Sequence, residues 1–200
     1  MYEFKDLGRL TKIACFFVAS YLVVDTVMSL GAVIEGPPAY EGDVRISDFV
    51  ALLDFLIIIA TFCVVGRWIY RASTNAHAVS DQMSITPGWA VGWYFVPFAN
   101  LIKPFHAMKE IWFASHQTDG SYEERAPGIL ALWWTLWIVN NVVGNVILQM
   151  TIRGGADQRT IDLIGLVSAT VNIPLCLVLI RIMREVSQSQ NFARHEATFA

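Results

Sequence analysis

The sequence predicts an all-α integral membrane protein with four transmembrane helices in two hairpins. Of its 200 residues, 55% are hydrophobic and only 16% are charged, and the mean hydropathy is +0.49. Soluble domains carry roughly 25% charged residues. Four apolar runs also reach the length of about 20 residues that a helix needs to cross a bilayer. These runs are residues 13–34, 49–69, 129–150 and 161–183, and we treat residues 1–200 as a single membrane domain.

The links between the apolar runs group the four spans into pairs. The first link is short and contains Gly36, Pro37 and Pro38, a combination that ends a helix. The link between the third and fourth spans is shorter still and turns at Gly154 and Gly155. Because short links force neighbouring helices to run antiparallel, we expect one hairpin from each pair of spans.

The Lys and Arg residues predict the orientation, because cytoplasmic flanks carry the positive excess. Of the 14 basic residues, most flank the termini or lie between the two hairpins, and few lie in the two short links. Both termini, including a tail over residues 184–200, are therefore expected in the cytoplasm. The cytoplasmic group is Lys5, Arg9, Lys12, Arg67, Arg71, Lys103, Lys109, Arg125, Arg181, Arg184 and Arg194, and the outer group is Arg45, Arg153 and Arg159.

Residues 86–116, between the hairpins, form a re-entrant or interfacial element. A fifth crossing here would place basic residues on the wrong side of the membrane. As a helix, the uninterrupted apolar part from Trp89 to Ala99 would extend about 17 Å, roughly half of a bilayer core. Residues 89–101 are therefore expected either to dip into the bilayer from the cytoplasmic side or to lie on its surface.

A second, amphipathic helix is expected to begin near Pro104, since proline is well tolerated in a first helical turn. Phe105, Met108 and Trp112 share one face of this helix, whereas His106 and Glu110 lie on the opposite face. This distribution is typical of a helix at the cytoplasmic surface of a membrane.

The apolar half of the same element contains a candidate groove. Trp89 and Trp93 stand four residues apart, as do Gly88 and Gly92, so one helical face is aromatic and an adjacent one is small. One interpretation is structural anchoring of a re-entrant hairpin. The other is a groove for lipid or an apolar ligand, in which Pro97 frees backbone carbonyls that Asn100 or a ligand then satisfies. The groove residues are Trp89, Trp93, Pro97, Asn100, Lys103, His106 and Glu110.

His106 and Glu110 are spaced so that both side chains could meet one metal ion or exchange one proton. His77 and Asp81 have the same spacing on the other side of the break. Such pairs are also common on solvated helix faces, and no established metal or catalytic motif accompanies these. We therefore predict no metal site and no catalytic residue, and the sequence indicates no particular cofactor.

Ionisable and amide side chains within the apolar runs form a second candidate site, because they are costly in a bilayer. Asp25 and Asp54 both fall in the outer half of their spans. A polar pocket that opens outward and admits protons or ions is one interpretation, with Arg153 as a counter-charge. Hydrogen bonding that fixes helix packing is the other. The candidate residues are Asp25, Asp54, Asn141, Asn145 and Asn172.

The sequence argues against two classes of feature. The three cysteines, Cys15, Cys63 and Cys176, all lie within predicted spans, where a disulfide framework of the secreted type is not expected. The net charge of -3 gives no basic surface for nucleic acid.

The middle of the chain resembles a known family. Residues 67–79 read RWIYRASTNAHAV, and residues 86–112 read TPGWAVGWYFVPFANLIKPFHAMKEIW. This series resembles the bacterial membrane-protein family catalogued as domain of unknown function 4328. The chain departs from the usual pattern at Ile102 and His106. The resemblance implies a membrane fold and a location in the bacterial cytoplasmic (inner) membrane, without implying a reaction.

The leading functional expectation is a non-catalytic membrane module, meaning a scaffold, an accessory subunit or a signal-coupling element. It would bind lipid and other membrane proteins, or form a homo-oligomer. One alternative is a small channel or transporter built around Asp25 and Asp54. The other is a membrane enzyme that uses His106 and Glu110 on a lipid-soluble substrate.

Overall fold

The computed structural model describes residues 2–36, 46–116 and 127–199, with side chains described for 2–36, 51–116 and 127–192. The predicted stop at Pro37 and Pro38, together with Arg45 and Arg125, lies outside these residues. All regular structure in the described residues is helical, so the predicted all-α class is confirmed. The elements are α1 (Gly8–Glu35), α2 (Ile46–Val79), α3 (Pro87–Gly92), η1 (Trp93–Phe95), η2 (Ala99–Leu101), α4 (Lys103–His116), α5 (Gly128–Arg153) and α6 (Gln158–Phe199).

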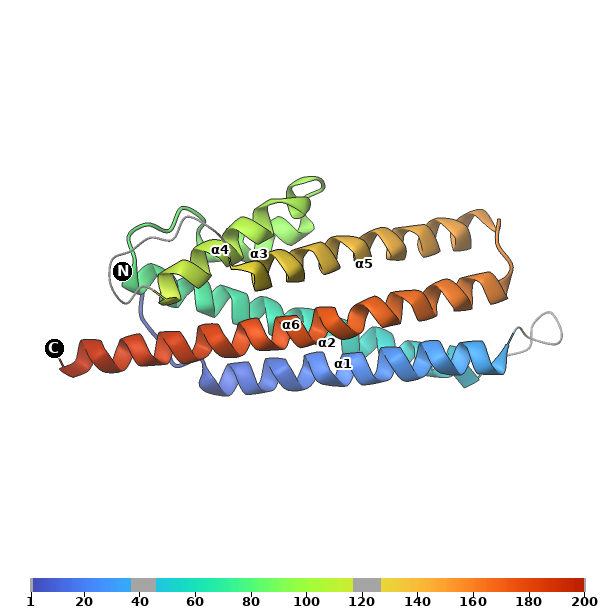
Figure 1. Ribbon diagram of the computed structural model, residues 1–200, viewed down its shortest axis with the longest axis horizontal. Coiled ribbons are helices and arrows are strands. Elements are labelled where there is room, and N and C mark those ends of the chain that lie inside the picture. Colours follow the sequence, from blue (N-terminus) through green and yellow to red (C-terminus); the bar gives the residue numbers. More distant parts are fainter. Residues whose placement is uncertain (1, 37–45, 117–126, 200) are drawn as a thin grey trace.

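Four helices, α1, α2, α5 and α6, are long and apolar enough to cross a membrane, and they contain the four predicted spans. Helices α1 and α2 form one antiparallel pair, and α5 and α6 form the other (Figure 1). Both termini lie at one end of the bundle, which we call the terminal end. At the opposite end, which we call the loop end, α1 and α5 end and α2 and α6 begin.

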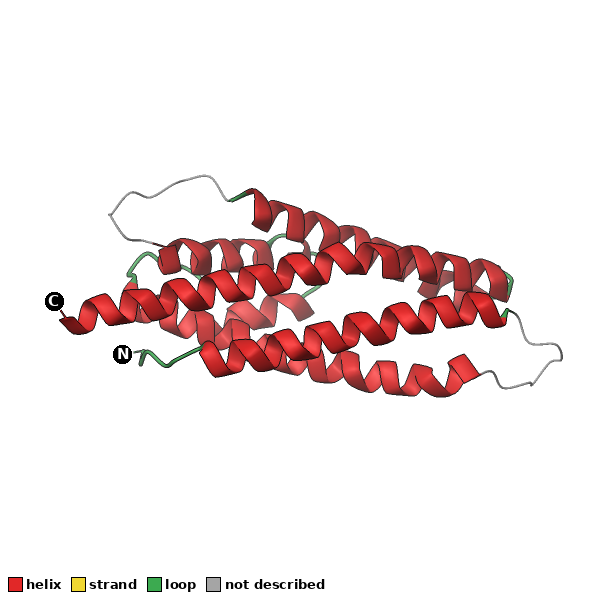
Figure 2. Ribbon diagram, turned by 60° about the horizontal axis from the view of Figure 1, so that its bottom comes forward, coloured by secondary structure: helices red, strands yellow, loops and turns green. Residues whose placement is uncertain are grey.

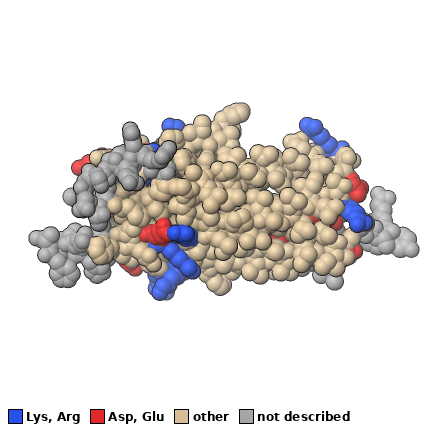
Figure 3. Space-filling view, in the orientation of Figure 1, with Lys and Arg blue, Asp and Glu red and all other residues tan. Residues whose placement is uncertain are grey.

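The surface of the bundle is suited to a multi-pass membrane protein. On the face shown in Figure 3, Lys, Arg, Asp and Glu gather toward the two ends of the molecule, and a wide belt without Lys or Arg separates them. Large apolar side chains are exposed along the spans, including Phe16, Ile34, Leu52 and Phe62. A lipid-facing surface requires such a belt, because lipid tails offer no hydrogen-bonding partner.

Helix α6 occupies the centre of the bundle, since it packs along both α1 and α5, while α2 packs along α1. The described regular structure is helical throughout (Figure 2), and the two short helices α3 and α4 form a hairpin in the terminal half of the bundle (Figure 1). Helix α3 contacts α2, and α4 contacts α2, α5 and α6. The hairpin therefore fills the space between α2 and α5.

Helix α4 begins at Lys103, one residue before Pro104, close to where a helix start is expected. Its Met108, Ile111 and Trp112 are buried. This apolar face is covered by the neighbouring helices, because α2 and α6 continue past the apolar spans and pack against it.

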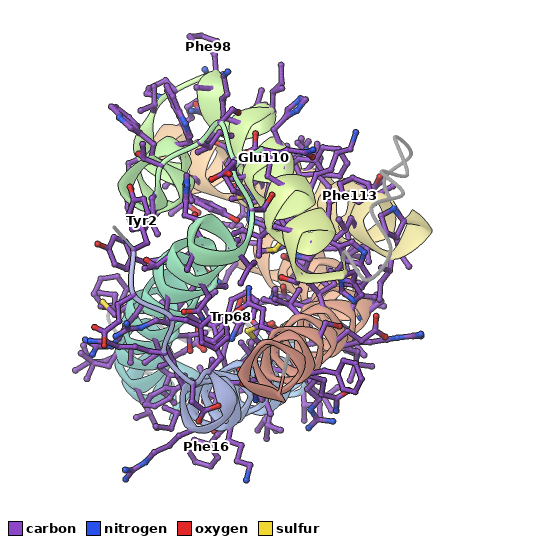
Figure 4. The ribbon with its side chains drawn as sticks, turned by 90° about the vertical axis from the view of Figure 1, so that its left-hand side faces the viewer. Tyr2, Phe16, Trp68, Phe98, Glu110 and Phe113 are labelled. Carbon is purple, nitrogen blue, oxygen red and sulfur yellow. The ribbon has the colours of Figure 1, made fainter. Side chains whose placement is uncertain are left out.

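Buried amides hold the terminal end together. Asn75 of α2 donates from Nδ2 to the Lys5 carbonyl (2.8 Å) and to Gln190 Oε1 (3.0 Å), and accepts at Oδ1 from the Lys5 backbone N–H (3.0 Å). Gln190 of α6 donates to the Ala72 carbonyl (3.0 Å) and to Ser115 Oγ (2.9 Å). Nearby, the indole of Trp68, which lies among the helices in Figure 4, donates to Thr11 Oγ1 (2.9 Å). Residues 184–199 of the expected tail thus continue α6, and its Gln190 bonds to α2 and α4.

Candidate functional site

A polar network joins three of the spanning helices. At its centre is Asn172 of α6, which is only 3% exposed. Its Nδ2 donates to the Tyr21 hydroxyl (2.7 Å) and to Asp25 Oδ2 (2.9 Å), both on α1. Its Oδ1 accepts from Asn140 Nδ2 on α5 (3.2 Å), and Asn140 Oδ1 accepts from Ser168 Oγ (2.9 Å). One amide therefore bridges the two halves of the bundle.

The structure joins two of the five predicted intramembrane residues directly, Asp25 and Asn172. Asn141 and Asn145 remain outside the network, because their amides donate to the Trp137 and Asn141 carbonyls of their own helix (both 2.8 Å). Asn140, which connects α5 to Asn172, was missed by the sequence reasoning. The sequence did offer a signal for Asn140, because it is an amide next to Asn141 within an apolar run. The two side chains lie about 100° apart on the helix, so they face different neighbours.

Asp54 approaches the network from α2. Its carboxyl lies within electrostatic range of Asp25. Thr61, seven residues further along α2 on the same face, donates to the Phe17 carbonyl of α1 (3.3 Å), so this face of α2 is turned toward α1. Within the described part of the chain, the buried Asp54 Oδ1 has no hydrogen-bond partner. A buried polar atom left in this state is costly.

The predicted aromatic pair in the α3–α4 hairpin is formed. The rings of Trp89 and Trp93 stack with their centroids 4.4 Å apart. The ammonium group of Lys103 lies 5.7 Å from the Trp93 ring centroid, within the range of a cation–π contact. The first residue of α4 is thereby tied to η1, which follows α3.

Three contacts with α5 fix the turn of the hairpin. The Trp134 indole donates to the Leu101 carbonyl (3.1 Å). The Tyr94 ring meets the Trp137 ring edge-on, with their centroids 6.1 Å apart. The ring centroids of Phe105 and Trp134 lie 6.2 Å apart. Burial raises the pKa of the Tyr94 hydroxyl.

The hairpin tip, defined as Phe95, Phe98, Leu101 and Ile102, presents exposed apolar side chains. Phe95 is 80% and Phe98 is 85% exposed, and Phe98 points away from the helices in Figure 4. Phe98 also has a φ of 63°, a conformation that residues other than glycine rarely adopt. Pro97 and Asn100 lie in the same turn, where the backbone N–H of Asn100 donates to the Val96 carbonyl (3.0 Å).

Glu110 and His77 hold the link that enters α3. Glu110 accepts hydrogen bonds from the backbone N–H groups of Ser84 and Ile85 (both 3.0 Å) and from the Ser84 hydroxyl. His77 Nε2 donates to the Ile85 carbonyl (3.0 Å). His106, by contrast, is exposed beside Phe105. The Glu110 carboxylate thus has a clear structural task in this link (Figure 4).

The other candidate groups do not gather into a metal centre. Asp81 is exposed, and the ring of His77 lies 4.8 Å from that of Tyr2. No group of three or more His, Cys, Asp or Glu side chains that could hold a metal ion occurs in the described ranges. The three cysteines are free thiols, with Cys15 and Cys176 buried and Cys63 exposed.

Comparison with known proteins gives one match. Residues 37–188 match the family model described as Domain of unknown function (DUF4328). The matched range includes the hairpin and most of the bundle, with α1 preceding it. No curated protein and no solved structure matches the chain at a significant level.

Substituting Glu110 by Ala is expected to release the link at Ser84 and Ile85. Hydrogen bonds to a charged group contribute about 1.5–3 kcal/mol, so amide exchange at these two residues should become about tenfold faster or more. Hydrogen–deuterium exchange of the detergent-solubilised protein measures this change. The control is His106→Ala, which alters an exposed residue of the same helix. Unchanged exchange in the Glu110 variant would contradict the assignment.

Proposed function

The chain belongs to the DUF4328 family, and we propose that it is a non-catalytic module of the bacterial inner membrane that binds membrane partners or lipid. In this role it serves as a scaffold, an accessory subunit or a signal-coupling element. Both termini and the α3–α4 hairpin face the cytoplasm, as the distribution of basic residues favours. The observation that carries the proposal is the exposed, conformationally strained Phe98 at the hairpin tip.

Backbone strain at Phe98 supports a binding role for the tip. An L-residue held at a φ of 63° costs of the order of 1–3 kcal/mol, and such strain persists only where the surrounding structure imposes it. Here Trp134 and Trp137 hold the flanking turns in place. Packing of the Phe98 ring within the chain does not offset the free-energy cost of this strained turn, because the residue is 85% exposed. Contact between the Phe98 ring and a lipid or partner surface would offset this strain.

The composition of the tip favours an apolar contact inside the cytoplasmic leaflet. Phe95, Phe98, Leu101 and Ile102 are all exposed and apolar. Lys103 follows them at once, and Trp89 of α3 and Trp93 of η1 precede them, as is usual at a headgroup boundary. We accordingly assign the hairpin as a shallow re-entrant element whose tip meets lipid tails or a partner helix.

The state of the candidate acid–base groups also favours a binding module over an enzyme. Glu110 and His77 are both engaged in holding Ser84 and Ile85, which gives them a structural role. A membrane enzyme built on His106 and Glu110 is the less favoured alternative for this reason.

Substituting Phe98 by Gly tests the module directly. Glycine adopts positive φ without strain, so the fold should be retained with little change in stability, while binding at the tip is lost. A photoreactive amino acid at position 98 of the protein in native membranes identifies the contact as a lipid or a protein adduct. Partner capture should fall in Phe98→Gly and persist in Phe192→Ala, a control at an exposed aromatic residue of α6. Equal capture by both variants would contradict the proposal.

A second candidate function is a small channel or transporter that uses Asp25 and Asp54. One specific observation favours it, namely that the buried Asp54 Oδ1 has no hydrogen-bond partner among the described residues. Carboxyl groups within a bilayer commonly mark routes for ions or protons.

Flux measurements in proteoliposomes test this second function. If Asp54 lies on an ion or proton route, Asp54→Asn should abolish a proton or sodium flux seen with the unmodified protein, because the amide neither ionises nor carries a charge. Asp157→Asn, at an exposed aspartate of the loop end, should leave the flux unchanged. Absence of flux from the unmodified protein, or equal flux in both variants, would rule out this candidate.

A further inference from the structure

Helix α5 carries a row of amide side chains that we call the amide stripe, Asn141, Asn145 and Gln149. Residues four apart lie on neighbouring turns of one helix face. Asn145 and Gln149 are exposed, and Asn141 is half-buried. Asn141 lies near the middle of the Gly128–Arg153 helix, and Asn145 lies one turn closer to its C-terminal end. Polar side chains at this depth contact either lipid or another polar surface.

The stripe faces away from α6. Asn140, turned by about 100° from Asn141, is the residue that points at α6, where it bonds to Asn172 and Ser168. Toward the terminal end, the side of α5 that bears the stripe is covered by the hairpin, through Trp134 and Trp137. The stripe begins one turn beyond Trp137 and continues this covered interface along the helix.

The amides of the stripe retain hydrogen-bonding capacity. A primary amide offers two N–H donors and an oxygen acceptor. Asn141 and Asn145 each use one donor on a carbonyl of their own helix, at 2.8 Å. Lipid tails satisfy none of the remaining groups. Interhelical hydrogen bonds between such side chains contribute about 1–2 kcal/mol in model peptides and less in intact proteins.

We propose that a second copy of this chain docks on the amide stripe, forming a parallel dimer across α5. Two copies inserted with the same orientation are related by a two-fold axis along the bilayer normal, so residues near the axis face their own counterparts. An amide is complementary to itself, as paired asparagines in parallel coiled coils demonstrate. The Asn140–Asn172 bond uses the same amide-to-amide pairing between α5 and α6.

Exposed apolar side chains beside the amide stripe also favour docking of a second copy of the chain. Val142, Leu148 and Ile152 are 56%, 53% and 70% exposed, and they flank the amides on the helix surface. A facing copy of α5 would bury all three while pairing the amides. This dimer rests on the proposed binding function, because it identifies one of the membrane partners as the chain itself.

Cysteine cross-linking in membranes tests the dimer. In a background with Cys15, Cys63 and Cys176 replaced by Ala, Asn145→Cys should form a disulfide-linked product of twice 22.4 kDa under mild oxidation. The control Val139→Cys, about 120° around the helix and also exposed, should not. No dimer from Asn145→Cys, or equal yields at the two positions, overturns the proposal. Attachment only to a different membrane protein also overturns it, while leaving the proposed module in place.

A second measurement covers the case in which the cysteine variant does not fold. Energy transfer between labelled copies in bilayers gives the monomer–dimer equilibrium of otherwise unmodified chains. Asn145→Leu should weaken dimerisation by up to about tenfold, which corresponds to 1.4 kcal/mol. Val139→Leu should leave it unchanged. A monomeric unmodified protein, or an Asn145→Leu variant that associates as well as the unmodified protein, contradicts the dimer.

Discussion

The hydrogen bonds of one buried amide, Asn172, hold the two spanning hairpins of this protein in register. Within lipid, the hydrophobic effect does not drive helices together. Close packing and interhelical hydrogen bonds must therefore stabilise their association. Asn172 supplies such bonds on both sides of α6, to Tyr21 and Asp25 of α1 and to Asn140 of α5. Gln190 repeats the arrangement at the terminal end, where it links α6 to α2 and α4. Helix α6 is therefore the element on which the others are assembled.

The position of the α3–α4 hairpin follows from this arrangement. Because α6 lies between α1 and α5, the hairpin can pack between α2 and α5 and rest on α6. Its two ends are then fixed by different means: Glu110 and His77 hold the entry link, whereas Trp134 holds the turn. The rigid frame leaves Phe98 exposed in a strained conformation, and a contact from outside the chain best explains why that strain is kept. The described surface of the fold thus includes an exposed apolar tip and the amide stripe.

Hydrophobicity and charge were sufficient to predict the four spanning helices, because a bilayer imposes length and composition directly on a sequence. The spacing of Trp89 and Trp93 also predicted a shared aromatic face, and in the structure the two rings stack. Hydropathy alone could not decide which of Asn140 and Asn141 faces α6, since one residue turns a side chain by about 100°. The partners of Glu110 lie 25 and 26 residues away in the chain, and local periodicity carries no information about such contacts. Likewise, no residue pattern signals the positive φ of Phe98.

A double-mutant cycle on Asn172 and Asn140 measures most directly whether the amide bridge holds the hairpins together. The free energy of unfolding in detergent micelles is compared for Asn172→Leu, Asn140→Leu, the double variant and the unmodified protein. If the two amides pair, the losses should be non-additive, with a coupling free energy of about 0.6 kcal/mol and up to about 1.7 kcal/mol. Additive losses would show that the two residues act independently, and Asn172 would then not be the bridge between the two halves of the bundle.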